Sequence, residues 1–466
     1  MPSATGVEVC FTLAGPGARA LAFLIDWVLR IVLAAAWYAA AAALYHGHWS
    51  LAAPLDAETR WFAGVVAPAA ALYFLSPFVF EVALRGSSPG KRATGVRLTT
   101  ASGDTPGAGA LLLRNVFRLV DALPLLYGVG LITVMLRRDH ARIGDLAAGT
   151  LLVYSSPAPQ LTGGRDLASA WSLVTAYRQL ARDCARARAT GRSAHDEEPL
   201  ERAYAQAHAL LHRPAVRPLL ALRGLFAREI PQAVTELRPH IAWVSALFVL
   251  AIAAGYALVA TYPDLISLFA SAEMIAAIKR GELWTESLLN IAPSAVLSVQ
   301  VLANNVVVSL FAFCAGFLFG LGTFYIVALN GLSLGAIFAF TALYGVQGRL
   351  FSFVIPHGCV ELSVMCLSGA AGAAVGEALI RPGSLPRSEA FQRAARRSGY
   401  VLVACVLLLV GCGLIEGYVS PRPGLALSAR LAIGVGYWSV MVALLRGGFG
   451  PGPGRRPSVR RIPTSR

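Results

Sequence analysis

Long apolar blocks separated by short polar stretches dominate the chain. Most blocks hold roughly 20 or more mainly apolar residues, the length that an α-helix needs to cross about 30 Å of hydrocarbon. The pattern predicts eight membrane-spanning helices, over Leu21–Tyr45, Phe62–Leu84, His240–Tyr262, Ala295–Leu329, Gly331–Gly345, Cys359–Ile380, Gly399–Tyr418 and Leu425–Leu445. The first block is too long for a signal-peptide core, so we expect it to be a retained helix. The expected fold class is an all-α integral membrane protein.

Changes in composition divide the chain into four regions. Residues 1–155 carry two predicted spans, residues 156–239 are a polar stretch with helical periodicity, and residues 240–446 hold the other six spans. The tail, residues 447–466, is rich in Gly, Pro and Arg and is predicted to be disordered. Within the first region the apolar run Ala122–Leu136 is short and broken by Pro and Gly, which predicts a re-entrant or interfacial helical segment rather than a crossing.

The charge of the chain follows the predicted topology. The net charge is +15, although 56% of residues are hydrophobic and only 14% are charged. Of the 40 basic residues, 33 fall at Arg19 and in segments 85–118, 137–142, 155–239, 381–398 and 446–466. Because basic residues concentrate in cytoplasmic loops, we expect a multi-pass protein of the bacterial inner membrane with cytoplasmic N- and C-termini. The basic excess then indicates attraction to anionic lipid and argues against a nucleic-acid ligand.

Charged residues inside the predicted spans are the first candidates for function. Arg19, Asp26 and Arg30 are spaced by seven and four residues, which places them on one helical face. An unpaired charge at such a position costs at least about 2.5–3.5 kcal/mol, so we expect Asp26 and Arg30 to neutralise each other, with Glu81 as a further acidic partner. Two interpretations remain open: internal ion pairs that fix helix packing, or a cation or proton site.

Residues 7–154 resemble the RDD family of membrane domains. The resemblance is carried by LAGPGARALAFLID, SPGKRATGVRL, LLLRNVFRLVDALPLLYGVGL and RRDHARIGDLAAGT, in that order. The family is named for one Arg and two Asp residues, which the resemblance assigns to Arg19, Asp26 and Asp145, with Asp121 as an alternative for the last. It implies a membrane domain for which transport, including sodium/proton exchange, has been proposed. SPGK lacks the spacing of a phosphate loop and predicts a turn.

Small and amide residues mark the fourth and fifth predicted spans. The stretches ANN, GFLFGLGTF and LNGLSLG place small residues where helices can approach closely in lipid. Asn304, Asn305 and Asn330 add side-chain amides that need partners there. The amides would either clamp tightly packed helices together or line a pathway.

The motif IPHGCVEL places His357 and Glu361 one helical turn apart after Pro356. Such a pair can bind a metal, relay a proton or hold two helices together by a hydrogen bond. One His and one Glu make an incomplete zinc site, and neither HExxH nor CxxC occurs in the chain. We therefore expect no catalytic residue, no metal and no cofactor.

Residues 168–446 resemble the stage II sporulation protein M family. The resemblance rests on the lead-in WSLVTAYRQLARDCARAR, YAQAHALLHRP and FAREIPQAV, followed by ANN, GFLFGLGTF, LNGLSLG, PHGCVEL and IEGYVSP. It implies membrane proteins that, in spore formers, are partners of cell-wall-degrading enzymes during engulfment.

The two resemblances together predict a non-enzymatic scaffold or assembly partner with membrane or envelope protein partners, acting in cell-envelope remodelling. The alternative is a secondary transporter of small cations or protons. One pathway would then use Arg19, Asp26, Arg30 and Glu81, and another would use His357, Glu361, Asn330 and Asn304 or Asn305.

Overall fold

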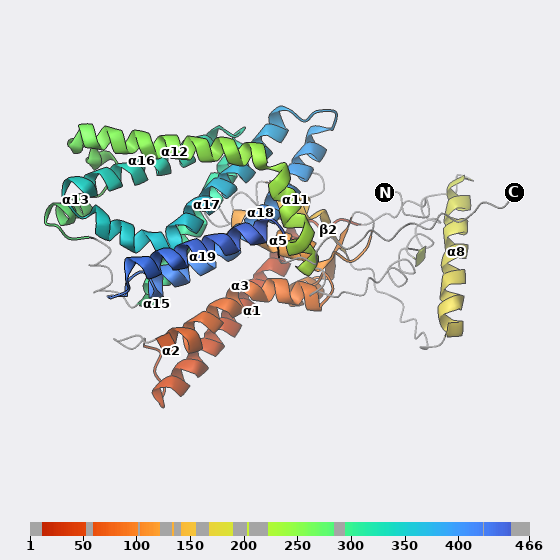
Figure 1. Cartoon of the computed structure of the whole chain (residues 1–466). Helices are drawn as coiled ribbons and strands as arrows, with labels where there is room; N and C mark the ends of the chain where they lie inside the picture. The colour runs from red at the N-terminus through yellow and green to blue at the C-terminus, as the bar shows by residue number, and fades with distance from the viewer. Residues whose placement is uncertain are drawn as a thin grey trace.

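The computed structural model describes the helical body of the chain (Figure 1). The described residues are 12–52, 59–100, 103–121, 133–134, 141–154, 167–189, 203–204, 222–283, 294–422 and 424–448. Seven helices in this part are long and apolar enough to cross a membrane, and Leu302–Phe317 forms a shorter apolar helix. The predicted all-α membrane fold is therefore confirmed. Most of the predicted re-entrant segment, Ala122–Leu136, lies outside the described residues, as does nearly all of the tail.

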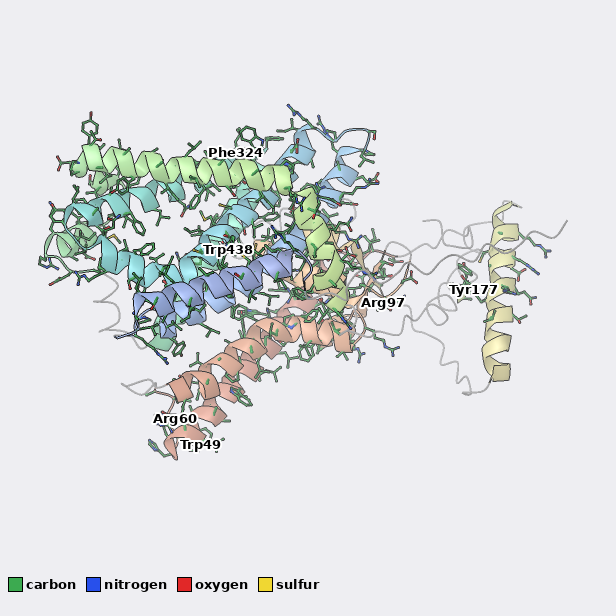
Figure 2. All side chains as sticks on the ribbon, viewed as in Figure 1. Trp49, Arg60, Arg97, Tyr177, Phe324 and Trp438 are labelled. Atoms are coloured by element: carbon green, nitrogen blue, oxygen red, sulfur yellow. The ribbon has the colours of Figure 1, made fainter. Side chains whose placement is uncertain are left out.

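The N-terminal part is a helical hairpin. Helix α1 (Pro16–His46) begins with a proline at its first position and ends at Gly47, whose φ of 70° is a left-handed conformation that glycine adopts without strain. The chain returns through α2 (Thr59–Trp61), the π-turn η1 (Phe62–Val66) and α3 (Ala67–Ala83), which packs beside α1. Trp49 and Arg60 lie at the tip of the hairpin (Figure 2).

A small mixed layer closes the opposite end of this hairpin. It consists of α4 (Pro89–Ala93), β1 (Val96–Thr100), α5 (Ala108–Asp121), α7 (Ile143–Ala148) and β2 (Thr150–Tyr154). The two strands are antiparallel, with Val96 opposite Tyr154 and Thr100 opposite Thr150. This sheet was not predicted, because two five-residue strands give a weaker signal than the apolar spans around them.

The middle of the chain contributes α8 (Leu167–Ala189), then η2 (Leu225–Glu229) and α11 (Ile230–Glu236). Helix α8 stands apart from the helical body, whereas α11 lies against it (Figure 1). Tyr177 of α8 stacks on Tyr204 with ring centroids 5.2 Å apart, and their hydroxyl groups are hydrogen-bonded at 3.0 Å. Both tyrosines lie in residues 156–239, the polar stretch whose periodicity predicts helices with apolar faces.

The C-terminal part is a bundle of long helices. Its elements are α12 (Arg238–Thr261), η3 (Pro263–Leu268), α13 (Ala272–Lys279), α15 (Ser294–Cys314), η4 (Ala315–Phe317), α16 (Leu321–Leu343), α17 (Gln347–Ile380), α18 (Arg387–Tyr418) and α19 (Leu427–Leu445). The predicted boundary between Leu329 and Gly331 is wrong, because the helix breaks earlier, at η4 and Gly320. Gly320 has a φ of 82°, whereas Gly331 continues α16 and lets it approach the backbone of α12 at Phe248.

The two helical parts share a core. Helix α5 packs against α18, where Gly399 leaves room for the side chains of Leu113 and Phe117. Phe117 in turn meets Phe313 of α15 edge to face, with ring centroids 5.7 Å apart. The end of the hairpin that carries the mixed layer is thus anchored on the C-terminal bundle.

Candidate functional site

A group of buried charged side chains joins α1 and α3 to the mixed layer. We call it the charged cluster; it comprises Arg19, Asp26, Glu81, Lys91, Arg114, Arg118, Asp121, Arg142 and Asp145. The structure thus brings Arg19 together with four of the predicted acidic candidates, Asp26, Glu81, Asp121 and Asp145. Lys91, Arg114, Arg118 and Arg142 were not among the predicted site residues, although all four stand in the motifs that carry the RDD resemblance.

Glu81 and Asp145 are the two acidic centres of the charged cluster. Glu81 accepts hydrogen bonds from Nζ of Lys91 and Nη1 of Arg114, both at 2.5 Å, and from Nδ2 of Asn115 at 2.8 Å. Asp145 accepts from Nη1 of Arg19 at 2.5 Å and from Nε of Arg114 at 2.6 Å. Arg114 therefore bridges the two carboxylates, both of which are fully buried.

Asp26 is held by the SPGK turn. Its Oδ2 accepts a hydrogen bond from the hydroxyl of Ser88 at 2.5 Å, and its Oδ1 accepts from the backbone N–H of Gly90 at 2.8 Å. Ser88 also caps α4, since its hydroxyl accepts from the backbone N–H of Lys91. A Cβ atom at Gly90 would overlap the carbonyl of Ala22 and the carboxylate of Asp26, so only glycine allows this approach.

The predicted pairing of Asp26 with Arg30 is wrong. Both Asp26 oxygens are occupied by the SPGK turn, and the Arg30 guanidinium lies instead over the ring of Tyr73, 5.0 Å from its centroid, and 5.8 Å from that of Phe23. Cation–π contact stabilises a desolvated cation where no carboxylate is within reach. Arg30 is thus placed outside the charged cluster.

The surroundings shift the pKa values of cluster residues outside the spans. Burial would raise the pKa of Asp145, but Arg114, Arg19 and Arg142 hold it well below its usual value. Burial would lower the pKa of Arg114, but Glu81 and Asp145 hold it above its usual value. Burial raises the pKa of Asp121 to about 6, against the lowering effect of Arg142. Burial lowers the pKa of Lys91 to about 8, against the raising effect of Glu81.

A pocket of about 300 Å³ reaches the charged cluster. Its charged lining residues are Arg19, Asp26, Lys91, Arg114, Arg118, Asp121 and Arg142. Five basic and two acidic side chains line this space, and Glu81 and Asp145 behind them leave the charged cluster with one excess positive charge. A positive pocket disfavours a free cation.

The asparagine candidates do not join one site. Asn330 donates to the carbonyl of Ile326 in its own helix at 2.8 Å, and Asn304 lies 3.5 Å from the side-chain oxygen of its neighbour Asn305. A side-chain amide that donates to a carbonyl one turn earlier in its own helix has a hydrogen-bond partner without needing a second helix. None of these hydrogen bonds connects the asparagines with His357, which pairs through Nδ1 with Ser420.

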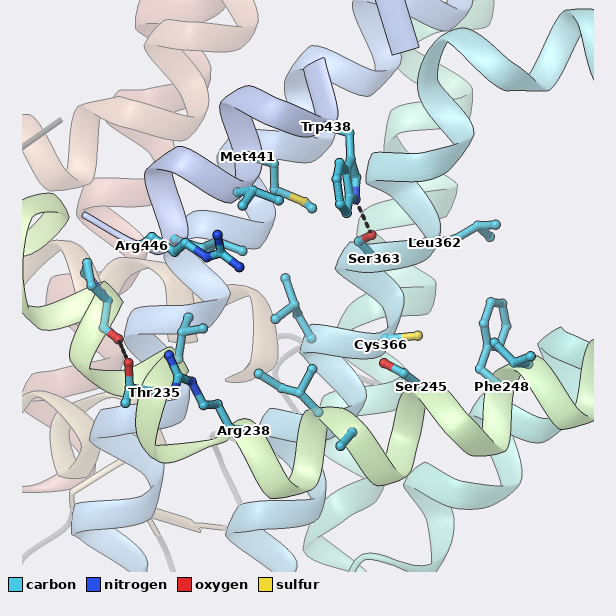
Figure 3. Close-up of a pocket in the computed structure, with 18 of the residues that line it drawn as sticks. Thr235, Arg238, Ser245, Phe248, Leu362, Ser363, Cys366, Trp438, Met441 and Arg446 are labelled. Carbon is cyan, nitrogen blue, oxygen red and sulfur yellow. Dashed lines mark hydrogen bonds between the residues drawn. The ribbon is translucent and has the colours of Figure 1, made fainter. Parts of the chain in front are cut away.

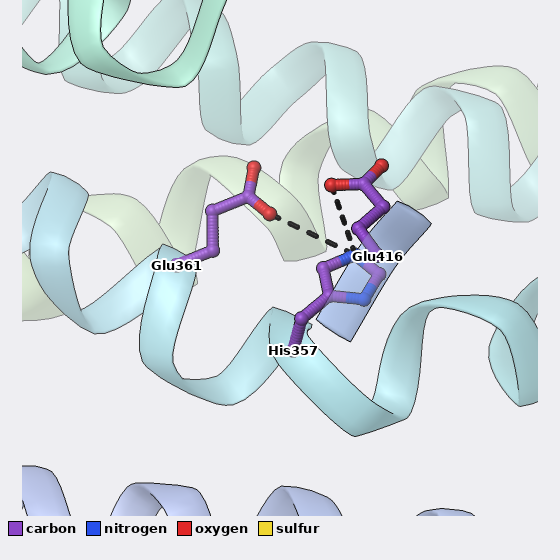
Figure 4. Close-up of side chains that lie close together, drawn as sticks. All are labelled: His357, Glu361 and Glu416. Atoms are coloured by element: carbon purple, nitrogen blue, oxygen red, sulfur yellow. Dashed lines mark ion pairs between the residues drawn. The ribbon is translucent and has the colours of Figure 1, made fainter. Parts of the chain in front are cut away.

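His357 and Glu361 instead meet Glu416, the third member of what we call the His–Glu cluster (Figure 4). Nε2 of His357 lies 3.8 Å from Oε2 of Glu361 and 3.7 Å from Oε2 of Glu416. One ligating atom of each residue fits within a 4.8 Å span. Glu416 was not predicted, because it lies on α18; the available signal was an acidic residue inside the IEGYVSP motif at the end of an apolar span.

A second hollow lies between α11, α12, α17 and α19. It has a volume of about 860 Å³ and a mainly apolar lining, with Trp438, Met441 and Phe248 among the residues facing it (Figure 3). Nε1 of Trp438 donates to the hydroxyl of Ser363 at 3.4 Å across this hollow. Arg238 and Arg446 lie at one end of it.

Seven candidate spans and many large exposed apolar side chains define a multi-pass α-helical membrane protein. Residues 13–149 match the model of the RDD family, and residues 244–421 match the model of Stage II sporulation protein M. The chain is therefore a fusion of an RDD domain with a Stage II sporulation protein M domain. The predicted fusion is confirmed. No curated protein and no solved structure matches the chain.

Proposed function

We propose that the chain is a non-enzymatic scaffold or assembly partner in the bacterial inner membrane, with cytoplasmic N- and C-termini, acting in cell-envelope remodelling. The observation that carries this proposal is the bonding of Glu81 and Asp145 within the charged cluster. Glu81 and Asp145 each accept two or more hydrogen bonds at 2.5–2.8 Å from side chains of other elements. Buried charges bonded in this way fasten helices and are not free for a transported ion. Neither oxygen of the buried Asp121 carboxylate makes a hydrogen bond, and its ion pair is with Arg142 at 3.5 Å.

The packing of the two domains supports the same role. Helix α5 carries Arg114 of the charged cluster and also packs against α18, so the cluster holds in place a helix through which the RDD domain contacts the second domain. The role that the second domain's resemblance implies, partnership with cell-wall-degrading enzymes, supports an envelope function. A rigid two-domain body would present fixed surfaces to such partners.

The alternative proposal is a secondary transporter of small cations or protons. It is favoured by the pocket of about 300 Å³ that brings Asp26 and Asp121 into contact with open space. The excess of basic residues around that pocket works against it, because a cation entering would meet five positive side chains.

Ion flux and complex formation separate the two proposals. Wild type, Asp26→Asn and Glu361→Gln would be reconstituted in proteoliposomes under imposed sodium and proton gradients, with Asp264→Asn as an exposed control. The scaffold proposal expects no flux from folded wild type. Native electrophoresis of source-cell membranes should then show a complex that contains a cell-wall-degrading enzyme and that Asp26→Asn reduces. Flux abolished by Asp26→Asn or Glu361→Gln, but not by Asp264→Asn, would overturn the scaffold proposal.

A further inference from the structure

The His–Glu cluster combines three ligands of two types, one imidazole and two carboxylates, where α17 packs against α18. His357 and Glu361 stand one turn apart on α17, and Glu416 reaches them from near the end of α18 (Figure 4). His357 is 3% exposed, so its ring is enclosed by the bundle. The side chains of Glu416 and Glu361 keep 13% and 28% exposure, so the cluster is not fully enclosed.

The distances within the cluster are those of groups that share an ion. At 3.7 and 3.8 Å from Nε2 of His357, the two carboxylate oxygens are too far away for hydrogen bonds. Zinc binds nitrogen and oxygen ligands at about 2.0–2.2 Å, so two ligands of one tetrahedral ion lie about 3.4 Å apart. The two distances from Nε2 of His357 exceed this value by a few tenths of an ångström, and the three ligand atoms all lie within 4.8 Å of one another.

The second ring nitrogen of His357 is positioned as metal-binding histidines require. Nδ1 lies 3.1 Å from the hydroxyl of Ser420, so donation from Nδ1 leaves the lone pair of Nε2 directed at the carboxylates. Ser420 is itself fixed, since its carbonyl accepts a hydrogen bond from Nη1 of Arg430 at 2.6 Å. This outer layer holds the imidazole in one orientation.

The cluster lacks a positive partner. Among the described residues, no Arg or Lys nitrogen lies within 4.0 Å of Glu361 or Glu416. Oε2 of Glu416 is buried and makes no hydrogen bond. Two carboxylates at such a place in a membrane bundle need neutralisation, and a divalent cation supplies it while using the same oxygens as ligands.

We infer that His357, Glu361 and Glu416 bind one divalent transition-metal ion of the Zn²⁺ class, through Nε2 of the histidine and one oxygen of each glutamate. An imidazole with two carboxylates suits Zn²⁺ or Mn²⁺ better than Ca²⁺ or Mg²⁺, which prefer oxygen ligands alone. Three protein ligands leave a fourth position for water. The site does not depend on the proposed scaffold role, because it requires neither a protein partner nor ion flux.

Metal titration of the purified full-length chain tests the site. The protein, with its affinity tag removed, would be stripped with a chelator in detergent and titrated with Zn²⁺, and Co²⁺ absorption would report the coordination geometry. Wild type should bind one Zn²⁺ per chain, in competition with Co²⁺. Glu416→Gln and Glu361→Gln should each weaken binding at least about 10-fold, and Ser420→Ala about 10-fold through loss of the histidine's orientation.

The matched control is the other His–Glu pair of the bundle. Nε2 of His240 lies 2.8 Å from Oε2 of Glu377, but among the described residues no third ligand joins them, so Glu377→Gln should leave Zn²⁺ affinity unchanged. Gel filtration and thermal unfolding without metal would establish that each variant is folded. If Glu416→Gln does not fold, the Zn²⁺ affinity of Ser420→Ala would be compared with that of wild type instead. Wild type that binds no Zn²⁺, or a Glu377→Gln variant that loses as much affinity as the cluster variants, would overturn the site.

Discussion

Nη1 of Arg430 lies 3.2 Å from the carbonyl oxygen of Ser352, the carbonyl that Pro356 leaves without a helical partner. A proline inside a helix removes the N–H that would bond the carbonyl four residues earlier. The guanidinium of Arg430, on α19, replaces that donor and also donates to the carbonyls of Ser420, Arg422 and Leu425. A charged residue within a predicted span is thereby satisfied by backbone oxygens.

Replacing Arg430 should therefore destabilise the bundle. Arg430→Gln removes the donor of one buried and three partly buried carbonyls, and a buried one left unsatisfied costs about 1–3 kcal/mol. We expect a loss of at least about 2 kcal/mol in the free energy of unfolding, measured by denaturant titration in micelles. Arg422→Gln is the control, because the Arg422 side chain is exposed and only its carbonyl is used. Equal stability of the two variants would show that the carbonyls find other donors.

Glu81→Gln tests whether the charged cluster holds the RDD domain together. The change leaves Lys91 and Arg114 buried with less compensation, which costs about 3–5 kcal/mol when one partner of a buried pair is removed. Thermal unfolding should report this loss. Glu377→Gln, which breaks the more exposed pair with His240, should cost less than about 1 kcal/mol. A small effect at both positions would mean that water already solvates the cluster.

The apolar spans could be predicted from the sequence because block length alone reports a membrane crossing. The partners of the charged residues could not, because each lies on a different element. Helical spacing put Asp26 and Arg30 on one face, yet a backbone N–H from the SPGK turn took the place of Arg30. Spacing along one helix likewise joined His357 to Glu361 but gave no means of finding Glu416, which comes from the next helix.

Gly335→Ala tests the close approach of α12 and α16. A Cβ atom at Gly335 would overlap the carbonyl of Ile252, so the helices must separate. Overpacking of this kind typically costs 1–3 kcal/mol, and we expect a loss in that range in the unfolding free energy. Gly436→Ala is the matched control on α19, because nothing lies within 4 Å of the position its Cβ would take. Destabilisation by the control alone would contradict the packing.

Asp121 should make stability depend on pH in a defined direction. Its pKa is about 6 in the folded protein because of burial, against about 3.9 in an unfolded chain. Between these values the folded protein binds more protons, so the contribution of Asp121 is complete below pH 4 and is lost as the pH rises through 6. Asp121→Asn removes this dependence and leaves Arg142 paired with Asp145 at 3.8 Å.

The measurement is the difference in unfolding free energy between Asp121→Asn and wild type from pH 4 to 7. We expect the unfolding free energy of the variant to rise relative to that of wild type as the pH rises, by up to about 3 kcal/mol for a shift of about two pKa units. Asp264→Asn, an exposed position on η3, should show a difference that does not vary with pH. If the unfolding free energy of the variant instead falls relative to that of wild type with rising pH, the attraction of Arg142, 3.5 Å away, outweighs the burial of the Asp121 carboxylate.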